Sequence, residues 1–351
     1  MDRAITTNVV TDVNRIVVLR ANALGDLVFT LPALEALSLA YPDAEIVLLA
    51  REWHRELLAV RPGPVDRVVP VPAFEDTLGP EDHQELDKVI TAMAAEGVDL
   101  ALQLHGGGAN SNPLVCRLDA RVSAGLQDTG AETLDRNVPY VVYQSEVERL
   151  LEVVATVGAV PLNRQPHFPV IESDRAEAGA IVPVGGPLAV LHPGASDPRR
   201  RWPGERFAAV GDALAQAGAS VVVTGTAAEV LLVQEVVDAM RRPATPLAGA
   251  LSIGGLAGLL AGAGVVVSND TGPLHLAAAV GTPTVGIFWC GNLINAGPTT
   301  RSRHRPAISW VLDCPVCATN CITGSCGHTG SFVVGVDAEE VCTSALDLLN
   351  C

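Results

Sequence analysis

The chain has 351 residues, 48% of them hydrophobic, which is enough to form two compact domains of about 150 residues each. Its 39 acidic and 23 basic residues give a formal net charge of -16, which repels the phosphates of nucleic acids and so excludes a nucleic-acid-binding role. No segment is typical of a targeting signal or of a transmembrane helix, so we expect a cytoplasmic protein.

Apolar runs of strand length alternate with helical patterns along the chain. From the N-terminus, the expected strands are residues 15–20, 45–49, 100–104, 188–191, 220–223, 265–267 and 284–288. Helical periodicity is clear over residues 31–40, 147–157, 207–217 and 228–240. Continuous apolar runs are typical of strands buried in parallel sheets, and their alternation with helices is the βαβ pattern. The sequence therefore predicts an α/β fold built from parallel sheets.

A stretch rich in proline and glycine divides the chain. We interpret residues 166–187 as an interdomain linker, between an N-terminal domain over residues 1–165 and a C-terminal domain over residues 188–335. The last segment, residues 336–351, carries a helical apolar stripe and could pack back across the cleft between the domains.

Each predicted domain opens with an apolar strand that enters a polar loop containing glycine, "VVLRANALGD" in the first and "LAVLHPGASDPRRRWP" in the second. This repetition indicates two Rossmann-like domains that face one another. Neither opening has the three glycines of the dinucleotide fingerprint, which disfavours an NAD-dependent dehydrogenase.

The first loop, "RANALGDLVFTLPAL", places Asp26 directly before an apolar helix. The carboxylate could simply cap this helix. Alternatively, a carboxylate at a cleft between domains can accept a proton from a hydroxyl nucleophile. The local pattern leaves both interpretations open.

Two loops of the second domain are candidate anion sites. The stretch "HPGASDPRRRWPGERFA" combines Ser196 with the arginines 199–201, either as a solvated surface or as an anion trap. The stretch "SNDTGPLHLAAAVGTPTVGIFW" opens a helix at Asp270, Thr271 and Gly272, and its N-terminal dipole also attracts anions. His275 lies in the first turn, so it is either neutral or faces an anion. Two anion sites on one domain indicate a diphosphate ligand.

These three stretches, in this order, resemble the family 9 glycosyltransferases, which are typified by the ADP-heptose:lipopolysaccharide heptosyltransferases. The resemblance covers nearly the whole chain and is most specific in "DTGPLHLAAAVGTP", which is similar to the family pattern D-T-G-x-x-H-x-A-A-x-x-x-x-P. It implies a GT-B fold, in which two Rossmann-like domains face one another, and inverting transfer from a nucleotide-sugar, with ADP-heptose as the expected donor and no metal required.

The resemblance also implies roles for individual residues. Asp26 matches the general base of the family, and Arg200 matches its phosphate-binding cation. Glu229 is similar to the position that contacts the donor nucleoside, although a glutamate on a helix surface is a competing interpretation. The expected donor and phosphate set is Ser196, Arg200, Glu229, Asp270, Thr271, Gly272 and His275. For Asp270, which would repel phosphate, helix capping or a bond to a sugar hydroxyl is the expected role.

The acceptor side is less defined. Arg20 and His105 are candidate acceptor-binding residues, because His105 opens the loop "LHGGGANSNPLV", which suits a polyhydroxylated partner. A purely structural turn explains the same loop equally well. The acceptor could be a lipopolysaccharide-like core, a cell-wall glycan or a small molecule. Rival interpretations are a non-catalytic nucleotide-sugar-binding protein and a family member with a different donor.

Cysteines concentrate near the C-terminus. The spacing of Cys314, Cys317, Cys321 and Cys326, with His328 close behind, could ligate a structural zinc ion or an iron-sulfur cluster. Free structural thiols or disulfides are the alternatives. Catalysis does not require these cysteines in either case.

Overall fold

The computed structural model describes residues 9–72, 80–182 and 185–350. Its contacts divide the chain into two compact units, Met1–Pro169 and Val170–Cys351. The division lies inside the predicted linker, and that linker also contains helix α6 (Glu172–Gly179), which packs against α9 (Ile253–Ala261) of the second unit. Most of the predicted linker is therefore part of the second unit.

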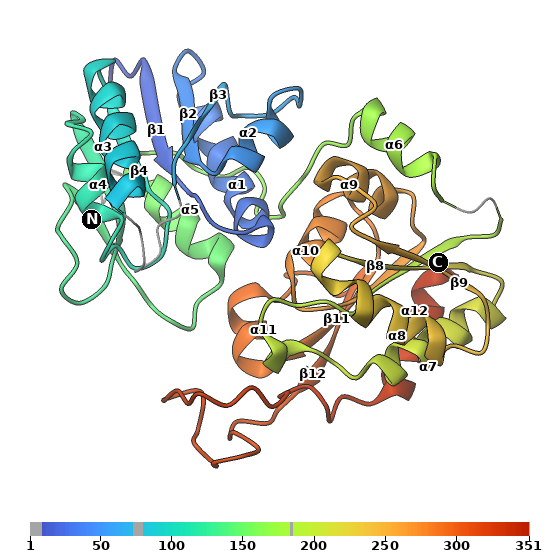
Figure 1. Cartoon of the computed structure of the whole chain (residues 1–351). Coiled ribbons are helices and arrows are strands. Elements are labelled where there is room, and N and C mark those ends of the chain that lie inside the picture. The colour runs from blue at the N-terminus through green and yellow to red at the C-terminus, as the bar shows by residue number, and fades with distance from the viewer. Residues whose placement is uncertain (1–8, 73–79, 183–184, 351) are drawn as a thin grey trace, which may run out of the picture. The chain divides into compact units, whose positions relative to one another are not determined.

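The first unit contains a parallel sheet of six strands in the order β3-β2-β1-β4-β5-β6 (Figure 1). In chain order, its elements are β1 (Arg15–Leu19), α1 (Leu24–Ala40), β2 (Glu45–Ala50), α2 (Glu52–Leu58), β3 (Arg67–Pro70), α3 (Pro80–Ala95), β4 (Leu100–Gln103), α4 (Asn112–Cys116), β5 (Val122–Gln127), β6 (Arg136–Pro139) and α5 (Glu146–Thr156).

The second unit repeats this arrangement, with a parallel sheet in the order β12-β11-β10-β7-β8-β9. After α6, its elements are β7 (Leu188–His192), the short helix η1 (Pro198–Arg200), α7 (Gly204–Gln216), β8 (Ser220–Gly225), the short helix η2 (Ala227–Glu229), α8 (Val230–Ala239), β9 (Ala244–Ala248), α9, β10 (Val265–Asn269), α10 (Gly272–Ala279), β11 (Thr284–Trp289), α11 (Cys290–Ala296), β12 (His304–Ser309) and α12 (Ala338–Leu349).

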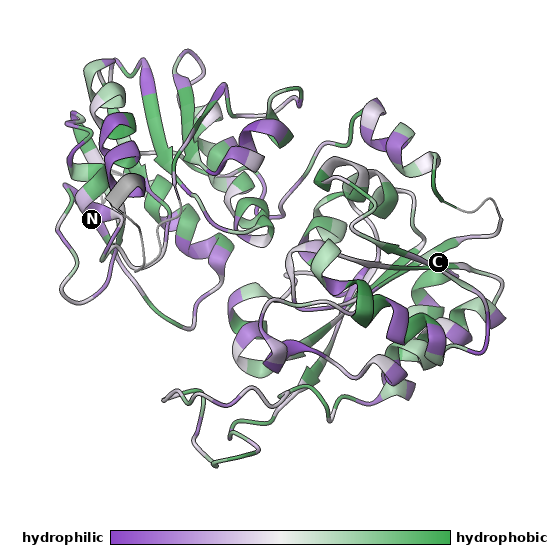
Figure 2. Cartoon of the chain, viewed as in Figure 1, coloured by the Kyte–Doolittle hydropathy of each residue, from purple (hydrophilic) through white to green (hydrophobic). Residues whose placement is uncertain are grey.

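Each sheet forms the core of its unit. In the first unit, apolar side chains of α3 and α4 pack on β1, β2 and β4. In the second unit, α7, α8 and α12 pack on the sheet around the buried ring of Phe207. Figure 2 shows that the strands are the most hydrophobic elements, whereas most helices carry hydrophilic residues as well. The α/β prediction is confirmed, and a return of α12 across the cleft between the domains stays a prediction.

The strand order places the loops that matter for binding. In each sheet, the chain starts at a central strand, β1 or β7, fills one side, and then crosses to the other side through β4 or β10. At such a switch point, the loops at the carboxyl ends of the two central strands diverge and leave a crevice, which is where open α/β sheets bind ligands. The loops after β1 and β4, and those after β7 and β10, are therefore the expected binding loops.

Candidate active site

Asp26 lies at the third position of α1, close to the switch point of the first sheet. Its Oδ2 accepts the backbone N–H of Ala23 at 3.1 Å, so the carboxylate does cap the helix. Its Oδ1 accepts a hydrogen bond from Nη2 of Arg20 at 2.7 Å, and the side chain keeps 29% of its surface exposed. A carboxylate offers about four acceptor positions, so capping leaves room for a hydroxyl proton. The two interpretations of Asp26 are compatible.

Arg20 is a buried cation at the end of β1. Its guanidinium donates to the carbonyl of Leu104, which follows β4, and lies 3.6 Å from a carboxylate oxygen of Glu146 at the start of α5. Glu146 also binds Arg149 at 3.1 Å. Contacts from three elements therefore fix the guanidinium beside Asp26. Sequence reasoning missed Glu146, although Ser145 before it, which caps α5, marks a helix start.

His105 belongs to the same group. Its Nδ1 accepts the backbone N–H of Ala21 at 3.2 Å, which connects the loop after β4 to the loop after β1. Burial lowers the pKa of His105 to about 4, and the neighbouring charge of Arg20 acts in the same direction. The imidazole is therefore neutral at physiological pH. We call Arg20, Asp26, His105 and Glu146 the first-unit cluster.

The glycine-rich loop after β4 is an ordered turn held by side-chain hydrogen bonds. Gln103 and Ser111 both donate to the carbonyl of His105, at 2.6 and 2.9 Å. Gly108 has a φ of +95°, and a Cβ at that position would lie 2.6 Å from Nδ2 of Asn112. The loop therefore needs glycine for its shape, and this shape fixes the position of His105.

Arg200 is the cation of the second unit that reaches across the switch point. Its Nη1 donates to the backbone carbonyl of Asp270 at 3.1 Å and lies 3.3 Å from the Asp270 carboxylate, while Nη2 bonds Ser196 Oγ at 3.3 Å. Arg199 pairs with Asp197, and Arg201 donates to the carbonyl of Ala195, so both stay within their own loop. The arginine triplet is therefore not a uniform solvated surface.

Asp270 lies at the centre of this group, with only 1% of its side chain exposed. Its carboxylate bonds His275 Nε2 at 3.0 Å and accepts from Asn292 Nδ2 at 2.9 Å, in addition to Arg200. Burial alone would raise the pKa of Asp270, but the hydrogen bond from His275 and the charge of Arg200 bring this pKa below its usual value. Asp270 is therefore the anion that His275 faces. We call Ser196, Arg200, Asp270 and His275 the second-unit cluster.

The structure does not give Asp270 the capping role expected for it, because Thr271 is the N-cap residue of α10 and the Asp270 carboxylate bonds the side chains of Arg200, His275 and Asn292. Thr271 is the N-cap of α10, and its side chain makes no capping hydrogen bond. The helix begins at Gly272, so the positive end of its dipole lies directly beside the second-unit cluster. Sequence reasoning missed Asn292, because it lies on α11 and outside the motif.

Glu229 lies against the loop after β7. It ends the short helix η2, and its Oε2 accepts the N–H and the hydroxyl of Thr226 at 2.8 and 2.9 Å. A Cβ at Gly194 would lie 2.3 Å from Glu229 Oε1, so the glycine is what allows this close approach. The carboxylate is thus half-buried beside the binding loop and does not lie on the exposed surface of a helix.

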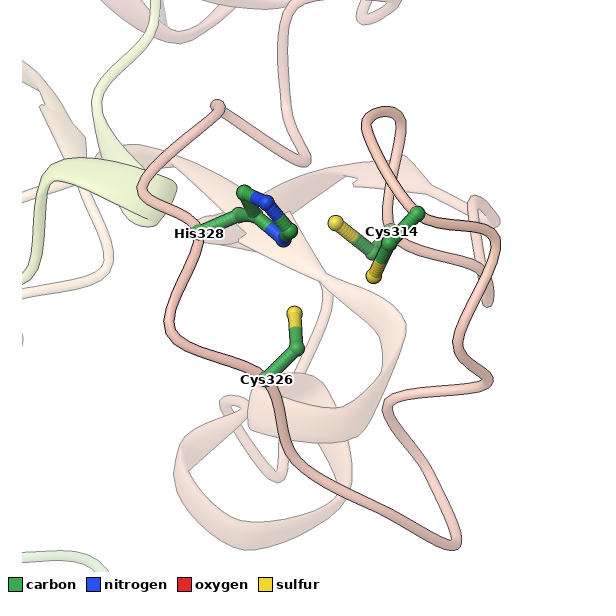
Figure 3. A group of neighbouring side chains, drawn as sticks. Cys314, Cys326 and His328 are labelled. Atoms are coloured by element: carbon green, nitrogen blue, oxygen red, sulfur yellow. The ribbon is translucent and has the colours of Figure 1, made fainter.

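Three of the four predicted cysteine ligands near the C-terminus lie together with His328 in one group of possible metal ligands. The ligand atoms of Cys314, Cys317, Cys326 and His328 all lie within 4.8 Å of one another. Figure 3 shows the side chains of Cys314, Cys326 and His328 pointing into one common space. Cys321 is outside the group, and His328 takes the place that we expected Cys321 to fill.

Two Rossmann-like units with parallel sheets, each with charged groups at its switch point, are the architecture of a GT-B glycosyltransferase. Residues 87–307 match the model of glycosyltransferase family 9, the heptosyltransferase family. The chain belongs to this family and is a glycosyltransferase, as the sequence predicted.

Individual proteins agree with this assignment. Lipopolysaccharide heptosyltransferase 1 of Pseudomonas aeruginosa is 27% identical over 288 residues, which cover 78% of each chain. The family 9 glycosyltransferase of Veillonella parvula has a similar structure, with a TM-score of 0.79 and 22% identity over 98% of this chain and 99% of that one. ADP-heptose lipopolysaccharide heptosyltransferase II of E. coli follows, with a TM-score of 0.75 and 20% identity over 96% and 98%. Among the described residues, no helix is long and apolar enough to cross a membrane.

Proposed function

We propose that the chain transfers heptose from ADP-heptose to a hydroxyl group of a glycan acceptor, with inversion at the anomeric carbon. The observation that carries the proposal is that each unit presents a different half of the required chemistry at its switch point. The first-unit cluster holds a partly exposed carboxylate, and the second-unit cluster holds the cation Arg200 beside a helix N-terminus.

Asp26 is the proposed general base. As the acceptor oxygen attacks the anomeric carbon, its proton passes to Asp26, and the electron pair of the breaking bond passes to the diphosphate. Arg20 holds the carboxylate in place through its hydrogen bond to Oδ1. We assign acceptor binding to the first unit, because a neutral imidazole such as that of His105 can form hydrogen bonds with a polyhydroxylated acceptor.

The second unit is the proposed donor site. Arg200, Ser196 and His275, with the amides of Thr271 and Gly272 and the dipole of α10, stabilise the departing diphosphate. Asp270 orients Arg200 and His275 through its contacts with both side chains. Glu229, beside the loop after β7, is suited to accept hydrogen bonds from the donor nucleoside. Arg200 and the N-terminal dipole of α10 supply positive charge directly to the diphosphate. We therefore propose that transfer uses no metal or other cofactor.

For the acceptor, the family assignment favours a lipopolysaccharide-like core. The Pseudomonas relative is named for lipopolysaccharide, and we propose a related acceptor that is reached from the cytoplasmic side. A cell-wall glycan or a small molecule would use the same base. A non-catalytic binding protein would use Asp26 only as a helix cap, and it is the weaker candidate because the relatives are named as heptosyltransferases.

Calorimetric titration with ADP, UDP, GDP and dTDP, followed by ADP-heptose, tests the donor. We expect selective binding of ADP and release of ADP from ADP-heptose when an acceptor is present. The variant Asp26→Asn should bind ADP as the unmodified chain does but lose turnover by a factor of about 100 or more. Near-normal transfer by this variant, or preference for another nucleotide, would contradict the base or the donor assignment respectively.

A further inference from the structure

The segment between β12 and α12 is long and irregular. We call residues 313–330 the finger. Its regular pairing, as the structure describes it, is one isolated bridge between Asp313 and Asn320. The segment between β12 and α12 runs as an irregular loop (Figure 1). Irregular loops of this length are uncommon in compact domains unless they are functional or held by some other device.

Burial does not hold the finger. Cys314 is the one buried residue between positions 313 and 330, all of which the structure describes, and Val316 keeps 64% of its surface exposed. The two ends, by contrast, are fixed. Trp289 Nε1 donates to the carbonyl of Val311 at 2.6 Å, and the Trp289 ring stacks on Phe332 at 5.2 Å between centroids. The finger is therefore anchored at both ends but has no hydrophobic core of its own.

The four clustered side chains come from two short pairs. Cys314 and Cys317 lie on one turn, in which Cys314 bonds Thr319 and Ala318 through its backbone at 2.8 and 2.9 Å. The N–H of Val316 points to Cys314 Sγ at 3.4 Å, and Ala318 adopts a left-handed φ of +58° to close the turn. Cys326 and His328 form the second pair, from the returning half of the finger (Figure 3).

We infer that these four side chains bind one Zn²⁺ ion, which holds the finger closed. Three thiolates and one imidazole form a common tetrahedral zinc set, in which the ligand atoms lie about 3.7 Å apart. The observed separations, up to 4.8 Å, need only a small inward movement to reach this geometry. An iron-sulfur cluster is typically bound by four cysteines, and Cys321 does not lie in the group.

The zinc site is linked to the donor loop through the base of the finger. The N–H of Phe332 donates to the carbonyl of Arg199 at 2.8 Å, and Ser331 Oγ donates to the carbonyl of Arg201 at 2.7 Å. These bonds lie on both sides of Arg200, the proposed phosphate-binding cation. The ion therefore stabilises the backbone that carries Arg200; this second step, unlike zinc binding itself, rests on the proposed function.

Metal analysis of the untagged full chain tests the site. We expect one equivalent of zinc per chain, and less than a tenth of this in Cys326→Ser and His328→Asn. Cys321→Ser is the matched control, because it removes a thiol of the finger that lies outside the group, and it should keep its zinc. Should the variants fold poorly, Co²⁺ exchanged into the unmodified chain should give the visible spectrum of a tetrahedral thiolate site. Absence of zinc with no uptake of Co²⁺, iron in its place, or a disulfide between Cys314 and Cys317 would each overturn the assignment.

Titration with ADP tests the link to the donor loop. Removal of zinc by Cys326→Ser should weaken ADP binding about three- to tenfold, because the donor loop then loses order before binding. Cys321→Ser should bind ADP normally. Unchanged affinity in a zinc-free variant would overturn the link, although the zinc site would stand. If the unmodified chain binds no ADP at all, the proposed function fails, while the metal analysis still decides the zinc site.

Discussion

Replacing Asp270 with asparagine should destabilise the second unit, because Asp270 is the shared partner of two basic side chains. The side chain is 1% exposed and contacts Arg200, His275 and Asn292 at 3.3, 3.0 and 2.9 Å. Removing one member of a buried ion pair costs about 3 to 5 kcal/mol. Asparagine keeps the shape and one acceptor oxygen, and Arg200 is 26% exposed and thus partly screened. We therefore expect a loss of about 2 to 3 kcal/mol in the free energy of unfolding.

Urea denaturation followed by tryptophan fluorescence suits this measurement, because Trp202, Trp289 and Trp310 all lie in the second unit. Asp197→Asn is the matched control, because its pair with Arg199 is half-exposed and should contribute less than about 1 kcal/mol. The Asp270 effect should also depend on pH. Since the pKa of Asp270 is lowered in the folded state, its contribution is present above the unfolded pKa of about 3.9 and is lost as pH falls through the lower folded pKa.

The two denaturation curves should therefore converge at acid pH, where Asp270 in the unmodified chain becomes protonated. A difference at pH 7 below about 0.5 kcal/mol would show that Arg200 and His275 do not depend on this carboxylate. A difference that persists unchanged at acid pH would show that the lost contribution comes from packing and not from charge.

Three further changes test the first unit. Arg20→Lys should lower kcat about tenfold or more with unchanged ADP affinity, because one ammonium nitrogen cannot take the positions of both Nη1, which serves Leu104, and Nη2, which serves Asp26 and Glu146. Equal kcat would refute the positioning role. His105→Asn should change the maximum rate in a pH-rate profile but not the shape of the profile between pH 5.5 and 8, roughly the range in which an ordinary histidine titrates, since the pKa of His105 is about 4. If the variant lost a pH-dependent rise or fall in rate within that range, the neutral state of His105 would be refuted. Gly108→Ala should lower the free energy of unfolding by about 2 kcal/mol more than Gly106→Ala, because both glycines have positive φ but a Cβ would collide with Asn112 only at position 108. Thermal unfolding of the two variants measures this difference, and equal losses would refute the steric argument.

The sequence predicted the central strands of the fold and missed its edges. All seven predicted strands exist, and they correspond to β1, β2, β4, β7, β8, β10 and β11. Four of the missed strands, β3, β6, β9 and β12, are the outer strands of the two sheets. An edge strand is covered less completely, so it needs no continuous apolar run, and it tolerates proline. All four contain proline, as in "HRPAIS" of β12.

The predicted ends of the helices also show what local sequence patterns fail to predict. Helical periodicity predicted the first helix from residue 31, whereas α1 begins at Leu24 and contains Pro32. The glycine and aspartate of its first turn are weak helix formers, and proline normally ends a helix. Here the side chain of Asp26 accepts the N–H of Ala23 and so supports the first turn. The capping interaction could be predicted from the sequence, but the seven residues that it adds to the helix could not.

In the candidate site, the sequence predicted candidate residues, whose roles stay predictions, but not their partners. Arg200 and Asp270 are 70 positions apart, and they meet because β7 and β10 are neighbours in the sheet. That contact explains how a carboxylate can lie in the proposed phosphate site. A buried anion with two basic neighbours does not repel the ligand as a free carboxylate would, because its charge is already compensated.

The reverse arrangement occurs in the first unit, where the carboxylates of Asp26 and Glu146 hold the buried cation Arg20. In a chain with a net charge of -16, unpaired site cations would be drawn to many competing carboxylates on the surface. A dedicated carboxylate prevents this by fixing each guanidinium in one orientation before a ligand arrives. Binding then requires little reorganisation, which is the condition under which preorganised charge stabilises a departing diphosphate most effectively.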